Sequence, residues 1–134
     1  MLHAYLAAPD GRTFEALWRR CSFDLDQVRG RLGERWDAYA AYTLDRAVAP
    51  GALAGLTALM EQFGFPPIPP EDLARIAVPT TLIWGRHDLA TSLTVAEAAS
   101  ARYGWPLHVI ERAGADPATD QPERFVEVLL AVLG

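Results

Sequence analysis

Cysteine and basic residues are scarce in this sequence. Its 134 residues include one cysteine, Cys21, which excludes an internal disulfide and fits a reducing compartment. Lysine and arginine total 12 against 17 acidic residues, and the net charge of −5 argues against nucleic acid or an anionic membrane as the main partner. No apolar stretch reaches membrane-spanning length, and the opening MLHAYLAAPDGR lacks the basic start and apolar run of a signal peptide. These absences predict a cytoplasmic protein.

The rest of the composition is that of a folded chain. Hydrophobic residues make up 51% and charged residues 22%, and the length suits one domain with a core of its own. The segment GFPPIPP, residues 64–70, divides the chain, because four prolines in five residues can neither continue a helix nor lie inside a sheet. We therefore expect an extended connector between two parts, residues 1–65 and residues 66–134.

Helical periodicity dominates the first part. A helix is expected to start at Asp10-Gly11, and Asp24 is the expected N-cap of the next helix. A third helix ends before Pro50, and a fourth covers residues 53–63 and ends at Gly64. The apolar positions of the first three helices are Phe14, Leu17, Trp18 and Cys21, then Val28 and Leu32, then Trp36, Tyr39, Ala40, Leu44 and Ala47.

The second part alternates strands and helices. VPTTLIWG, residues 78–85, is typical of a strand, because it is β-branched and apolar with a proline near its start. Residues 106–111, PLHVIE, predict a second strand, and residues 94–97 and 120–123 have the spacing of helix capping boxes. This order predicts two parallel strands joined by a right-handed crossover. The last helix is expected to carry one apolar face, made of Phe125, Val128, Leu129, Val132 and Leu133.

Three segments of the second part resemble the α/β hydrolases. They are DLARIAVPTTLIWGRHDLATSL, YGWPLHVIERAGADP and DQPERFVEVLLAVL, and their order and spacing carry the resemblance over residues 70–134. The resemblance implies that residues 66–134 form the carboxy-terminal βαβα part of an α/β-hydrolase core, with short parallel strands and flanking helices. Residues 1–65 resemble the all-helical lid of these enzymes. The expected fold class is therefore α/β, a partial α/β-hydrolase fold with a lid domain.

The resemblance places Asp88, at the end of the first strand, at the position of the catalytic-triad acid. A carboxylate beyond the carboxyl end of a parallel strand can hold an imidazole in one tautomer and stabilise its protonated form. Asp also commonly accepts hydrogen bonds from the amides of its own turn. The spacing of the residues alone leaves both interpretations open.

The other two members of the triad are missing. The family nucleophile lies in the motif G-x-S-x-G, and none of Ser22, Ser92 and Ser100 has flanking glycines. The family loop has the form G-A-G-H-x-P, and here Ala115 stands at the histidine position, where a methyl group cannot act as a general base. A shift of one residue would place Asp116 there, next to a second carboxylate and with no imidazole between them.

The remaining chemistry-bearing residues are interpreted as structural. His3 lies near the terminus, His87 in a turn with its side chain diverging from that of Asp88, and His108 inside a strand. Neither a metal-ligand spacing nor a CxxC or HExxH motif occurs, so we expect no metal, and the resemblance to α/β hydrolases implies no cofactor. Cys21 is interpreted as a packing residue on an apolar helix face.

Aromatic side chains of the helical part are the candidates for contact with a ligand. Trp18, Trp36, Tyr39 and Tyr42 can line an apolar pocket beneath a lid, and the first three are the candidates for substrate contact. Their helical spacing is also typical of ordinary core packing, and both interpretations stay open.

Three functions are compatible with these residues. In the first, the chain is the lid and carboxy-terminal half of a serine hydrolase with an incomplete catalytic triad, and it is active only together with a separate nucleophile half. The resemblance then implies action on ester, lactone or carbon–carbon bonds of small apolar substrates. Alternatively, it is a non-catalytic module derived from a hydrolase that binds a small ligand or a protein. The third interpretation is a truncated fragment without a role of its own. An alanine introduced by engineering at position 115 would give the same sequence.

All three interpretations leave the strand at residues 80–85 without its outer neighbour. Unpaired N–H and C=O groups flanked by apolar side chains attract another strand. We therefore expect self-association or binding to an amino-terminal hydrolase half.

Overall fold

The protein combines many helices with a small parallel sheet in a computed structural model that describes residues 2–64 and 67–134. In chain order the elements are α1 (Leu2–Ala7), α2 (Gly11–Cys21), α3 (Leu25–Leu32), α4 (Glu34–Ala47), α5 (Ala52–Leu59), the π-helical turn η1 (Met60–Gly64), α6 (Pro70–Leu73), β1 (Leu82–Gly85), α7 (Leu93–Tyr103), β2 (Leu107–Ile110), α8 (Pro117–Asp120) and α9 (Pro122–Leu133). The expected mixture of helices and strands is thus present.

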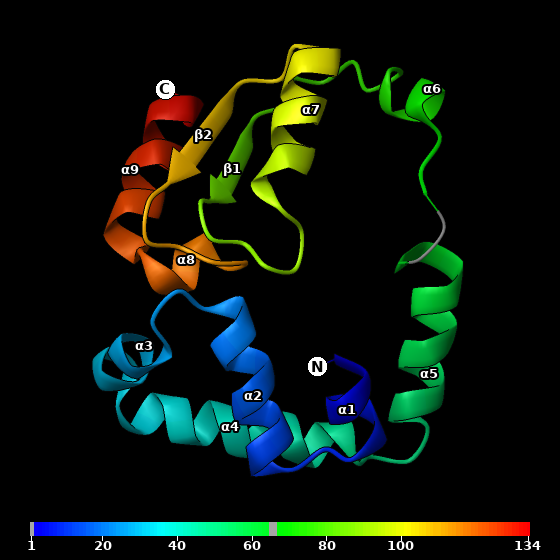
Figure 1. Cartoon of the computed structure of the whole chain (residues 1–134), viewed down its shortest axis with the longest axis vertical. Helices are drawn as coiled ribbons and strands as arrows, with labels where there is room; N and C mark the ends of the chain where they lie inside the picture. Colours follow the sequence, from blue (N-terminus) through cyan, green and yellow to red (C-terminus); the bar gives the residue numbers. More distant parts are fainter. Residues whose placement is uncertain (1, 65–66) are drawn as a thin grey trace.

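The sheet of the described residues has two parallel strands, as predicted. Its register pairs Leu82 with Leu107 and continues to Gly85 opposite Ile110, so both strands are shorter than the sequence pattern indicated. The sheet lies between α7 and α9, and the carboxyl ends of both strands point toward the helices of the first part (Figure 1).

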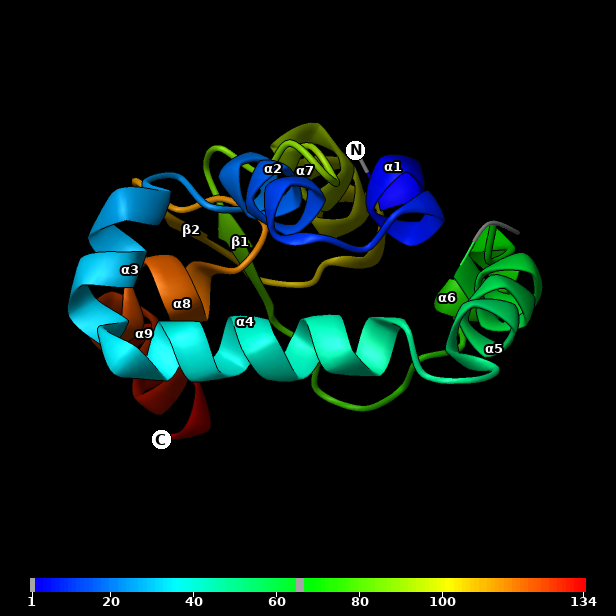
Figure 2. The same cartoon turned by 90° about the horizontal axis from the view of Figure 1, so that it is seen from below.

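The first part is organised around α4, with α1 and α2 on one side of it (Figure 2). Its core joins Tyr5, Phe14 and Trp36 to α3, whose Val28 is 1% exposed. The helix predicted at Asp10-Gly11 forms, and the Asp10 carboxylate accepts a hydrogen bond from the Thr13 amide at 2.7 Å. Aromatic packing and this cap together explain why the helical periodicity was a reliable guide here.

Two predicted helix starts were wrong in detail. Thr94 lies inside α7, because the helix starts at Leu93 and follows Ser92, which provides no side-chain cap. Asp120 does not cap α9; it ends the short helix α8 and is 4% exposed. Its carboxylate turns inward and accepts hydrogen bonds from backbone amides. For a buried anion, such charge-assisted hydrogen bonds are more favourable than capping a solvent-exposed helix start.

Other elements depart from the expected pattern. The sequence reading omitted α1 and α8, and the predicted fourth helix ends at Leu59 and continues as η1. On α9 the expected apolar face is mostly uncovered: Val128 is buried, whereas Leu133 is 71% exposed. The expected connector at residues 64–70 lies partly outside the described residues, which resume at 67 and enter α6 at Pro70.

The loop after β2 approaches two other segments so closely that it needs glycine. A Cβ added to Gly114 would lie 2.2 Å from the carbonyl oxygen of Cys21. A Cβ added to Gly85 would lie 1.9 Å from the carbonyl oxygen of Gly114. These contacts clamp the loop between the end of β1 and the end of α2, where the two parts of the chain meet.

Candidate functional site

The candidate site lies where the carboxyl ends of the strands face the end of α2. Asp88 follows β1 and is half-buried. Its Oδ1 accepts hydrogen bonds from the amides of Ala90 at 2.7 Å and Thr91 at 2.9 Å. Asp88 therefore caps its own turn, as one of the two interpretations expected. An oxygen engaged in this way also holds the carboxylate in a fixed orientation at the rim of the sheet.

The loop that carries Ala115 is anchored on both sides. The amide of His87 donates to the carbonyl oxygen of Ala113 at 2.8 Å, which joins the loop to the turn of Asp88. The amide of Ala115 donates to the carbonyl oxygen of Cys21 at 2.6 Å, which joins it to α2. The two positions that the hydrolase resemblance singled out, Asp88 and Ala115, thus belong to neighbouring, directly hydrogen-bonded segments.

Asp116 caps the short helix α8. It is the N-cap of α8, with Oδ1 accepting from the Thr119 amide at 3.1 Å and Oδ2 from the Thr119 hydroxyl at 2.6 Å. A carboxylate committed to two hydrogen bonds of its own helix is poorly suited to the acid–base role that a shift of the alignment would require.

A cavity of about 290 Å³ opens between the helical part and this loop; we call it the junction cavity. Trp18 and Tyr39 line it from α2 and α4, and Ala115 lines it from the loop. The described lining is Tyr5, Phe14, Leu17, Trp18, Cys21, Tyr39, Thr43, Ala115 and Asp116. The structure thus brings two of the three proposed ligand-contacting aromatics to the position of the missing histidine.

Trp36, the third aromatic, has a different place. It is 5% exposed and packs against Trp18 with edge-to-face geometry and ring centroids 5.2 Å apart. It lines a separate pocket with Arg29 of α3, whose guanidinium lies 6.0 Å from the centre of its ring. Trp36 therefore supports the orientation of Trp18 from behind and contributes no wall to the junction cavity.

Cys21 is a wall residue of the junction cavity and more than the packing residue that the sequence indicated. Burial of the thiol raises its pKa above the ordinary value, and the negative charge of Asp88 raises it further. Arg20 acts in the opposite direction and lowers the pKa, and Asp116 and Asp120 make smaller contributions that raise it. Since the thiolate is the reactive form of cysteine, this environment suppresses nucleophilic chemistry at Cys21 near neutral pH.

Asp120 fixes the position of the loop that carries Ala115 through hydrogen bonds to its carboxylate. Its Oδ2 accepts hydrogen bonds from the amides of Gly114 at 2.6 Å and Phe23 at 3.0 Å. Nearby, the guanidinium of Arg31 donates to the carbonyl oxygen of Thr119. One carboxylate therefore ties the segment after α2 to the loop of Ala115, across 97 positions of sequence between Phe23 and Asp120.

The histidines contribute nothing to the described lining. His87 is exposed and packs on the ring of Phe23, with centroids 4.7 Å apart, and His108 is half-buried in β2. The side chain of His3 lies outside what the structure describes. Over the described residues, no cluster of His, Cys, Asp and Glu has the arrangement of a metal site. Among the same residues, no helix is both long and apolar enough to cross a membrane.

Five residues of the described lining were not predicted as site residues from the sequence: Tyr5, Phe14, Leu17, Cys21 and Thr43. Cys21 follows Trp18 by three positions on α2, and Thr43 follows Tyr39 by four on α4, so helical spacing already placed each on the face of its aromatic neighbour. Tyr5 offered no such signal, because α1 was not expected.

Comparisons with protein-family models, with curated proteins and with solved structures found no match to this chain. The resemblance to α/β hydrolases therefore stays a prediction, based on the segments quoted above and on their order.

Proposed function

We propose that this chain is a hydrolase-derived segment that binds a small apolar molecule in the junction cavity and breaks no bond by itself. The observation that carries the proposal is the convergence of Trp18, Tyr39 and Ala115 on one cavity. Its size, about 290 Å³, is near the lower end of the range typical of small-molecule sites. Mostly apolar walls with few polar groups favour esters, lactones and similar neutral compounds.

The absence of catalysis follows from the groups that face the ligand. Acyl transfer needs a nucleophile and a base within hydrogen-bonding reach of each other. The described lining of the junction cavity contains neither serine nor imidazole, and the pKa of its thiol, Cys21, is raised. Asp88 alone can orient a base but cannot replace one.

A second candidate function is hydrolysis after association with an amino-terminal hydrolase half. The hydrogen bond from the His87 amide to the Ala113 carbonyl oxygen favours it, because this bond holds the Asp88 turn next to the loop where the family base would stand. In this case the other half supplies the nucleophile, and Ala115 keeps the assembly inactive until a histidine is present.

Binding can be tested through Cys21, the single cysteine of the chain, as a reporter. We expect ethyl butyrate to slow the modification of Cys21 by a thiol reagent in the wild-type protein. Ala115→Leu fills the junction cavity and should remove the protection, whereas Ala98→Leu, on the exposed side of α7, should retain it. Protection that survives Ala115→Leu, or no protection at millimolar ester, contradicts the proposed site.

Catalysis needs a separate assay with p-nitrophenyl butyrate. The wild-type chain should hydrolyse this ester no faster than buffer. The same assay with a candidate amino-terminal half, with and without Ala115→His, separates the two functions: turnover that requires both the half and the histidine supports the second candidate. Turnover by the wild-type chain alone would overturn both proposals.

A further inference from the structure

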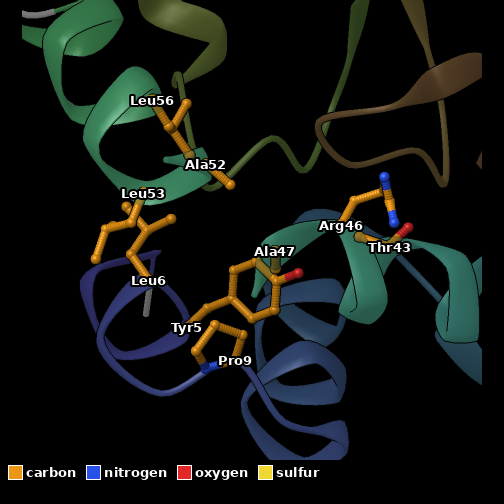
Figure 3. Close-up of a pocket in the computed structure, with 9 residues that line it drawn as sticks. All are labelled: Tyr5, Leu6, Pro9, Thr43, Arg46, Ala47, Ala52, Leu53 and Leu56. Carbon is orange, nitrogen blue, oxygen red and sulfur yellow. The ribbon is translucent and has the colours of Figure 1, made fainter. Parts of the chain in front are cut away.

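A second cavity, of about 280 Å³, lies inside the helical part between α1, α4 and α5 (Figure 3); we call it the helical cavity. Its apolar wall includes Leu6 from α1, Ala47 from α4, and Leu53 and Leu56 from α5. Tyr5 and Thr43 line both this cavity and the junction cavity, whereas Ala115 and Cys21 belong to the described lining of the junction cavity alone, so the two cavities are neighbours with a shared wall. Leu53 and Leu56 are 48% and 37% exposed, which is unfavourable for leucine side chains that face no partner.

One polar atom stands out in this wall. Tyr5 is 7% exposed, and its hydroxyl has no hydrogen-bond partner among the described residues. Figure 3 shows its ring extending from α1 with the hydroxyl end toward Ala47, and with Leu6 and Leu53 on the other side of the ring. A buried hydroxyl left unpaired costs about 1–3 kcal/mol, so a partner inside the cavity would bring a clear gain.

The state of this hydroxyl is well defined. Burial, with a smaller contribution from Tyr39, raises the pKa of Tyr5, so the group stays protonated over the physiological range and can donate a hydrogen bond. Arg46 also lines the cavity, but its guanidinium is paired with the carboxylate of the adjacent Asp45. The charge of Arg46 is thereby balanced locally, and the cavity favours a neutral ligand over an anion.

We propose that the helical cavity binds a small, neutral, largely apolar molecule with one acceptor oxygen, such as a ketone or ester, to which the Tyr5 hydroxyl donates. Apolar contacts with Leu6, Leu53 and Leu56 supply affinity, and the single hydrogen bond fixes the orientation. The site goes beyond the proposed function, since it uses the neighbouring cavity and none of the hydrolase-like positions, although Tyr5 lines both cavities.

The test uses two ligands of nearly the same shape. Acetophenone carries a carbonyl oxygen where α-methylstyrene carries a methylene group, so they differ mainly in the ability to accept a hydrogen bond. Titration of the wild-type chain, followed by calorimetry or NMR, should show acetophenone binding about tenfold more tightly. Tyr5→Phe should abolish this preference. Its affinity for α-methylstyrene and its melting temperature should be no lower than those of the wild type.

Cavity-filling variants locate the ligand. Ala52→Leu, or Leu56→Phe if the first variant does not fold, should abolish binding of both compounds, and Ala115→Leu should leave it intact. A preference for acetophenone that persists in Tyr5→Phe overturns the proposal, as does the lack of any binding at millimolar concentration. Loss of binding in Ala115→Leu alone would assign the compounds to the junction cavity and would leave the proposed function standing without this one.

Discussion

At the scale of single residues, the chemistry of the junction cavity depends on Cys21 and its charged neighbours. Burial is the largest cause of its raised pKa, and the carboxylate of Asp88 is the next. A group whose pKa is raised on folding contributes stability that is fully present below the pKa of the unfolded thiol, and this contribution is lost as the pH rises from there through the higher pKa of the folded protein. The pKa of the thiol therefore reports both on the burial of Cys21 in the cavity and on its distance from the Asp88 carboxylate.

We predict that alkylation of Cys21 by iodoacetamide has its pH midpoint above that of the unfolded chain in urea. Asp88→Asn should move the midpoint to lower pH without reaching the unfolded value, because burial remains. Asp37→Asn on the exposed side of α4 is the matched control and should leave the midpoint unchanged. An unchanged midpoint in Asp88→Asn would show that this carboxylate does not act on the cavity.

At the scale of elements, the contact between the helical part and the loop of Ala115 depends on Asp120. Its carboxylate accepts two backbone amides from segments far apart in sequence, and its Oδ1 is buried without a partner among the described residues. Placing a carboxylate here has a desolvation cost, which the two charge-assisted hydrogen bonds offset. The short helix α8 serves to present this side chain.

We predict that Asp120→Ala lowers the free energy of unfolding by about 1–3 kcal/mol for each amide left without an acceptor. Asp116→Ala, on the same short helix, removes only an N-cap and should cost about 1 kcal/mol. Urea denaturation measures both, and hydrogen exchange should show faster exchange at the Gly114 amide in the first variant alone. Equal losses in the two variants would mean that Asp120 does not hold the loop.

At the scale of the whole molecule, much apolar surface remains uncovered. Val78, Leu130 and Leu133 are each more than 60% exposed, with values of 70%, 63% and 71%. The amide of Leu82 donates to Pro106, just before β2, and that of Arg86 donates to Ile110 in β2. The alternating geometry of a parallel pair therefore directs the amide of Ile83 to the opposite edge, where no described strand lies. Such an edge attracts another strand.

We predict that the chain associates with itself or with a partner strand at micromolar concentration, as measured by size-exclusion chromatography with light scattering. Ile83→Pro removes the outward amide but spares the β1–β2 hydrogen bonds, so it should reduce association. Leu82→Pro is the contrasting variant, because it deletes the hydrogen bond to Pro106 and should destabilise the sheet itself. A wild-type monomer with a sharp, cooperative melting transition would contradict this expectation.

Most helices and strands could be predicted from local sequence patterns. The helices at Gly11–Cys21, Leu25–Leu32 and Glu34–Ala47 follow from apolar spacing and from capping at Asp10 and Asp24, which act within a few residues. Gly104 ends α7 in the left-handed conformation, which glycine adopts more readily than other residues. The predicted capping at residues 94–97 failed because α7 already begins at Leu93, and that at residues 120–123 failed because the Asp120 carboxylate accepts hydrogen bonds from the distant amides of Phe23 and Gly114.

The sequence by itself determined the amphipathic helices, the two parallel strands and the alanine at position 115, because periodicity, β-branching and residue identity are local properties. Only the tertiary structure decided that Trp18, Tyr39, Cys21 and Ala115 share one cavity, and that Asp120 turns inward. The physical reason is that these arrangements arise from close backbone approach between segments nearly a hundred residues apart, which no local preference encodes.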